Sequence, residues 1–121
     1  MNTSTNLLRQ VHPSFFNDGE LSSQAFFPFP KDDGKLSVYD GDMITPNDAY
    51  NHYTKTLQNE SIGVWGVTCL EVEQVGLRST PDPLDNFPSH ALIDFGTASK
   101  NTYRKLAKRL KEYAIKRGQL A

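Results

Sequence analysis

A run of lysine and arginine residues near the C-terminal end holds most of the groups in this chain that could recognise a charged partner. Residues 98–121 contain eight of the chain's 13 lysine and arginine residues but one of its 14 acidic residues, so an acidic body carries a basic segment. Such asymmetry indicates an electrostatic partner. The predicted interaction face comprises Arg104, Lys105, Lys108, Arg109 and Lys111.

The partner of this basic face is open to several interpretations. A row of cations on a helix could match acidic groups of a protein or successive phosphates of a nucleic acid. We favour a protein, because the acidic body would repel a duplex and because the terminal helix offers only Tyr103 and Tyr113 for stacking on bases. A homodimer would join the basic helix of one copy to the acidic turns of another. The competing view is a merely solvated face, since exposed charge pairs contribute little.

A second group of polar residues suggests different chemistry. If the fold brings them together, they could form a pocket for a phosphorylated or nucleotide substrate, in a small enzyme or a ligand-binding domain. Histidine and carboxylate side chains could then act as acid and base. However, His90 and Asp94, on one strand face, would stand about 13 Å apart, too far for a direct pair. The predicted pocket residues are Arg9, Gln10, His12, Asp40, Asp42 and His90.

The sequence predicts neither a metal ion nor another cofactor, and it identifies no catalytic residue. Carboxylates at short spacing can hold Mg²⁺ or Ca²⁺, but each aspartate in the segment 32–48 stands where a turn or helix cap already explains it. No EF-hand loop and no glycine-rich phosphate-binding loop is present. Cys69 is better explained as a small buried residue than as a nucleophile.

The length and composition favour one small domain. A chain of 121 residues has room for a single core, and we expect residues 1–6 to be flexible and residues 7–121 to fold together. No apolar run approaches the roughly 20 residues that span a bilayer. The start of the chain does not resemble a signal peptide, and there is one cysteine. We therefore expect a cytoplasmic protein without a membrane partner.

Local patterns predict the elements that must position these residues. Strands are expected at 7–11, 36–39, 62–68 and 90–95, and the proline-containing segment 21–29 is expected to be extended. Thr45 before Pro46 predicts a helix over 46–58, and Thr68 with Glu71 predicts a capped helix over 69–75. The strand 62–68 is apolar on both faces, as a central strand would be.

The terminal helix is predicted over residues 99–117, ended by Gly118. Its apolar stripe consists of Tyr103, Leu106, Ala107, Leu110 and Ala114. The fold class is α+β: a short mixed sheet with N-terminal hairpins and two or three helices, in which strands 62–68 and 90–95 could be parallel neighbours in a βαβ unit. The leading functional hypothesis is a small non-enzymatic binding protein, such as an adaptor, an accessory subunit or an immunity- or antitoxin-like protein, that recognises a macromolecule partly through the basic C-terminal helix.

Overall fold

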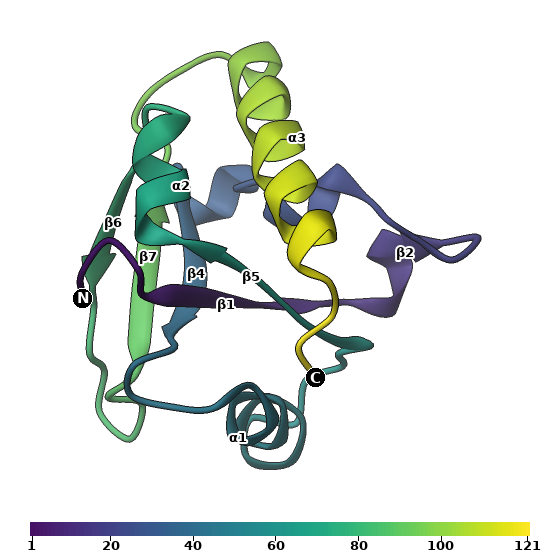
Figure 1. Ribbon diagram of the computed structural model, residues 1–121, viewed down its shortest axis with the longest axis vertical. Coiled ribbons are helices and arrows are strands. Elements are labelled where there is room, and N and C mark those ends of the chain that lie inside the picture. Colours follow the sequence, from purple (N-terminus) through teal and green to yellow (C-terminus); the bar gives the residue numbers. More distant parts are fainter.

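A five-stranded sheet forms the frame of the computed structural model, which describes residues 1–121 (Figure 1). The strand order is β5-β1-β4-β7-β6. The strands are β1 (Asn6–Val11), β4 (Lys35–Asp40), β5 (Gly63–Thr68), β6 (Arg78–Pro81) and β7 (His90–Asp94), and a separate hairpin joins β2 (Phe16–Asn17) to β3 (Glu20–Leu21).

This sheet confirms the α+β class but has no parallel pair. All its strand pairs are antiparallel. The suggested βαβ unit in a mixed sheet is wrong, because β1 and β4 lie between β5 and β7. The strand at 62–68 is also not central. It lies at the sheet edge, where Leu120 and Ala121 bond to Val64, so the C-terminal residues cover that edge.

The helices begin where their capping residues predicted. They are α1 (Pro46–Asn51), continued by the π-helical turn η4 (His52–Thr56), then α2 (Cys69–Gln74) and α3 (Lys100–Arg117). The Thr45 hydroxyl accepts from the Asp48 amide, and Ser99 caps α3 in the same way. Three short 3-10 helices are η1 (Pro13–Phe15), η2 (Ser23–Phe26) and η3 (Pro30–Asp32). The extended segment expected at 21–29 is interrupted by η2, which Ser22 caps. On either side of η2 the chain is extended, at Leu21 in β3, at Ser22, at Phe27 and at Phe29.

One face of the sheet is closely packed. Figure 1 shows α2 and α3 on the same side of β1 and β5. Ala107, Leu110 and Ala114 of α3 are fully buried there among residues of β1, β4, β5 and β7, together with Phe26 of η2. These contacts confirm the inner stripe predicted for the terminal helix. Burial of this stripe orients α3 and leaves its other side to solvent.

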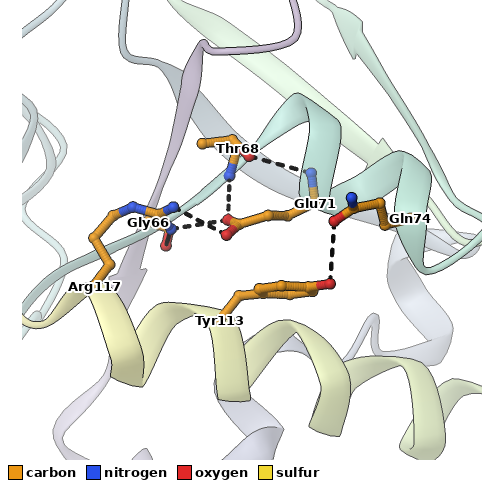
Figure 2. A network of polar contacts seen from close by, with 6 residues as sticks. All are labelled: Gly66, Thr68, Glu71, Gln74, Tyr113 and Arg117. Atoms are coloured by element: carbon orange, nitrogen blue, oxygen red, sulfur yellow. Dashed lines mark hydrogen bonds and ion pairs between the residues drawn. The ribbon is translucent and has the colours of Figure 1, made fainter.

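A polar network fixes the C-terminal end of α3 (Figure 2). Arg117 binds both carboxylate oxygens of Glu71 at 2.9 and 3.0 Å and also donates to the carbonyl of Gly66. Glu71 accepts from the Thr68 amide in the α2 capping box. Burial raises the pKa of Glu71, but the bonds from Arg117 and Thr68 outweigh this and lower it. The pair therefore ties α3 to α2 and β5.

The opposite face of the sheet carries a smaller apolar cluster under α1. It consists of Leu8, Tyr39, Ala49 and Val64. At the N-terminus, the carbonyls of Thr3 and Thr5 accept from the amides of Leu70 and Cys69. The flexibility expected for residues 1–6 stays a prediction. No helix combines the length and the apolar character needed to cross a membrane.

Candidate functional site

The five cations predicted as an interaction face lie on the outer side of α3. Arg104, Lys105, Lys108 and Arg109 are exposed, and Lys111 is half-buried. The structure pairs Arg117 with Glu71 and His90 with Asp82; no carboxylate of the same chain lies within 4.0 Å of the five. The face is thus a row of cations that the protein itself does not neutralise.

A groove continues this basic face at the N-terminal end of α3. It encloses about 330 Å³ between α3 and the segment that contains η2 and η3. Phe27, Phe29 and Pro30 form its apolar wall, and Lys100 and Arg104 form its basic rim. The groove could therefore accept a segment that combines acidic and apolar side chains.

A second cavity, of about 260 Å³, lies on the α1 side of the sheet. It is where three of the predicted pocket residues meet, namely Arg9 and Gln10 of β1 and His90 of β7. Its remaining lining comes from β1, β4, η4 and the loop before β7: Leu8, Ser37, Val38, Tyr39, Tyr53, Leu84 and Phe87. We call this space the Arg9 cavity.

Arg9 lies where the pairing of β1 with β4 has ended. The last pair is Leu8 with Tyr39, and beyond it the guanidinium bonds to both flanking segments. Nε donates to the carbonyl of Ala25 at 2.7 Å and Nη1 to that of Ser37 at 2.9 Å. Burial lowers the pKa of Arg9, and the nearby Tyr53 and Asp32 partly offset this. An arginine has five N–H donors, so some remain for a ligand.

Gln10 is a further polar residue in the lining of this cavity. Its side chain is buried, and its Oε1 accepts from the hydroxyl of Ser61 at 2.7 Å. Its amide nitrogen Nε2 is buried without a hydrogen-bond partner. A buried donor left unpaired is costly.

His90 connects a hydroxyl in the cavity to a carboxylate. Nε2 of His90 lies 3.1 Å from Oγ of Ser37 on β4, and Nδ1 lies 3.0 Å from Oδ2 of Asp82, just after β6. Nδ1 is also 3.0 Å from the backbone carbonyl of Asp82. Two acceptors beside Nδ1 favour the tautomer with its proton there, which leaves a lone pair on Nε2 facing Ser37.

Aromatic rings form the wall of the cavity beside His90. The ring of Phe87 has its centroid 4.8 Å from that of Tyr39, 4.6 Å from His52 and 5.0 Å from His90. Tyr39 and His52 are joined by a hydrogen bond of 2.8 Å from the phenol oxygen to Nδ1. Burial, followed by the charge of Tyr53, raises the pKa of Tyr39 well above the ordinary tyrosine value. These rings offer a flat apolar surface.

The other predicted pocket residues lie elsewhere. His12 is exposed and caps η1, with Nδ1 accepting from the Ser14 amide. Asp40 accepts from the Asp42 amide in the turn after β4, and Asp42 binds the Thr5 hydroxyl. The six residues therefore do not form one pocket, because these three serve turns and caps. No three His, Cys, Asp or Glu side chains gather to hold a metal ion.

Ser37, Asp82 and Phe87 of this site were not predicted. His90 was compared with Asp94, which shares its strand face, but its carboxylate partner is Asp82 across the β6–β7 connection. The contact of Ser37 with His90 joins residues 53 apart and depends on the β4–β7 register. Alternation along β4 could have placed Ser37 on the same face as Tyr39, but not beside a histidine.

Comparison of the chain with protein-family models, with curated proteins and with solved structures finds no match.

Proposed function

We propose that this protein binds a small anionic ligand in the Arg9 cavity. The main support is Arg9, which lines an apolar, aromatic cavity. No carboxylate of the chain lies within 4.0 Å of its guanidinium group. Arg9 is half-buried, and cations removed from water are normally paired, so a ligand anion is the partner that this arrangement lacks. Such a ligand would make a fork-like contact with the guanidinium, as carboxylates and phosphates do.

The volume of the cavity limits the size of that ligand. A cavity of about 150 Å³ can hold benzene, so the 260 Å³ here has room for one ring with a small charged group. The rings of Tyr39, Tyr53 and Phe87 suit a flat, apolar body. The ligand class is therefore a small planar acid, either a carboxylate or a phosphate monoester.

Calorimetric titration with benzoate, phenyl phosphate and neutral benzyl alcohol tests this proposal. One of the two anions should bind, and the alcohol should not. In Arg9→Met the dissociation constant should rise at least about 30-fold, since truncating one partner of a buried charge contact costs about 2–5 kcal/mol. Arg104→Met, which removes an exposed cation, should leave the affinity unchanged.

A second variant shows whether a loss of binding could result from unfolding rather than from a change in the cavity. Phe87→Ala removes the aromatic wall and keeps both backbone contacts of Arg9. It should weaken the binding of whichever anion binds the wild-type protein, while the variant stays folded by circular dichroism. If neither anion binds the wild-type protein, or if Arg9→Met binds both as well as the wild type does, the proposal is wrong.

A second proposal, independent of the first, is that the basic face of α3 docks an acidic protein segment. It is supported by the row of cations without intramolecular partners and by the groove with Phe27 and Phe29 beside it. Under this proposal the protein is an adaptor, accessory subunit or immunity-like protein. A cytoplasmic location belongs to the same proposal and is supported by the buried free thiol of Cys69.

Charge reversal separates this proposal from its alternatives. Arg104→Glu, Lys108→Glu and Lys111→Glu together should abolish binding of polyglutamate, a model acidic chain, in a titration at low salt. The matched control is the triple change of Lys35, Lys55 and Arg78 to Glu, which reverses equal charge away from α3 and its groove. Tighter binding of duplex DNA than of polyglutamate would instead favour nucleic acid, and unchanged binding after reversal would reject the face.

A further inference from the structure

We infer that Ser37, His90 and Asp82 form a nucleophilic triad that hydrolyses a small ester in the Arg9 cavity. This inference rests on the proposed anion-binding role of the cavity for its substrate class. Its own basis is the chain of contacts from Oγ of Ser37 to Nε2 of His90 at 3.1 Å and from Nδ1 of His90 to Asp82 at 3.0 Å.

The sheet sets the positions of all three residues. Tyr39 pairs with His90 and Ser37 with Leu92, so Ser37 and His90 are diagonal neighbours on one face of adjacent strands. Asp82 follows β6, and its amide donates to the carbonyl of His90 at 2.9 Å, which keeps its carboxylate beside the imidazole. Each residue thus comes from a different strand or its end, and the strands are held in register.

The roles follow from the tautomer. Asp82 accepts the proton on Nδ1, so the lone pair of Nε2 faces the Ser37 hydroxyl and can take its proton. His90 is largely buried, while Ser37 is exposed and lines the cavity. Ser37 is therefore the nucleophile, His90 the general base and Asp82 a positioning residue.

The reaction is balanced without a further reactant except water. The Ser37 oxygen bonds to the ester carbonyl carbon, and its proton passes to Nε2 of His90. The bond from that carbon to the alcohol oxygen then breaks, and the alcohol leaves with the proton from His90. Water attacks the acyl-serine in the same manner, which releases the acid and restores the Ser37 hydroxyl.

Arg9 gives this reaction its substrate preference. Nη1 of Arg9 donates to the backbone carbonyl of Ser37, so the guanidinium lies beside the nucleophile. Its free donors can stabilise the oxyanion of the tetrahedral intermediate and then the carboxylate of the released acid. The planar carboxylate proposed as a ligand is then the product, and the substrate is an ester of such an acid.

A fluorophosphonate probe tests the triad on the full chain. Ser37 should displace fluoride and form a phosphonyl adduct, seen as one added mass and located at Ser37 by peptide sequencing. Ser37→Ala should give no adduct, whereas Ser79→Ala, a strand serine paired opposite Ile93 on β7, should label as the wild type does. In His90→Ala the labelling rate should fall at least about a hundredfold.

The test of Asp82 must distinguish a role in positioning His90 from a role in the stability of the fold. Asp82→Asn should slow labelling at unchanged melting temperature, and Asp82→Glu should restore most of the rate. Absence of any adduct, or an adduct that persists in Ser37→Ala or forms at full rate in His90→Ala, overturns the triad. If benzoate binds through Arg9 while labelling fails, the cavity is a binding site only; if labelling succeeds while benzoate does not bind, the triad stands with another acyl group.

Discussion

The two faces of the sheet differ in how completely they are packed. On the α3 face, 19 buried residues form one cluster. On the α1 face the cluster has four residues, and beside it lie a cavity, a cation without a carboxylate partner and an unpaired amide. The charged group near the packed face, Arg117, is paired with the carboxylate of Glu71. The contrast suggests that one face supplies stability and that the other gives up packing for ligand recognition.

The largest expected effect is a difference in the free energy of unfolding between variants of the two faces. Leu110→Ala on the packed face should lower the free energy of unfolding by about 2–5 kcal/mol, because it removes a fully buried side chain and leaves a cavity. Leu84→Ala, on the rim of the Arg9 cavity and 49% exposed, should change it by less than about 0.5 kcal/mol. Urea denaturation of both variants measures this, and equal losses would contradict the contrast.

A smaller effect concerns the ion pair of the packed face. Glu71→Gln should lower the free energy of unfolding by about 1–3 kcal/mol at neutral pH, since it weakens charged hydrogen bonds to Arg117. Because the folded pKa of Glu71 lies below its ordinary value of 4.5, this stabilisation is present above that value and is lost as pH falls through the folded pKa. Denaturation at a series of acidic pH values should show wild type and variant converging.

Salt should separate the two charged regions. Exposed cations are screened, whereas a cation lining a cavity is screened much less. Raising salt from about 0.05 to about 0.5 M should weaken polyglutamate binding to α3 at least about tenfold and benzoate binding to the cavity less than about threefold. Calorimetric titration at both concentrations tests this. Equal sensitivity would mean that benzoate binds at the surface.

The smallest expected effect concerns the stability contributed by Tyr39, a residue of the cavity face, at alkaline pH. Tyr39 has a raised folded pKa, so its contribution to stability is complete below the ordinary tyrosine pKa of about 10 and is lost progressively as pH rises from there through the folded value. Ultraviolet titration should show a tyrosine that ionises late, and Tyr39→Phe should remove that step. At neutral pH the variant should lose about 1 kcal/mol or less, from the bond to His52. The same late step in Tyr39→Phe would assign it to another tyrosine.

Sequence patterns predicted the elements with local causes. The caps at Thr45, Thr68 and Ser99 act within three residues, and the stripe that includes Leu110 repeats at helical spacing, so both could be identified without tertiary contacts. The position of β5 at the edge of the sheet could not be predicted from such local patterns. Its apolar residues on both faces reflect cover by α3 and α1, which a single strand pattern does not distinguish from a central place.

The candidate sites differ in the same way. The basic face of α3 belongs to a single helix, so the helical spacing of its residues predicted both the exposed cations and the buried apolar stripe. The Arg9 cavity depends on where β1 separates from β4 and on the register of β4, β6 and β7. Arg9, Gln10 and His90 were named as polar residues, but grouping them with His12, Asp40 and Asp42 did not hold in the structure.

By itself the sequence determined the α+β composition, the helix boundaries near their caps and the two-sided character of α3, because these depend on contacts within a few residues. Only the tertiary structure decided the strand order and the meeting of Ser37 with His90 and Asp82. Those residues are 53 and 8 positions apart, and the free energy that holds them together comes from the pairing and packing of the whole sheet.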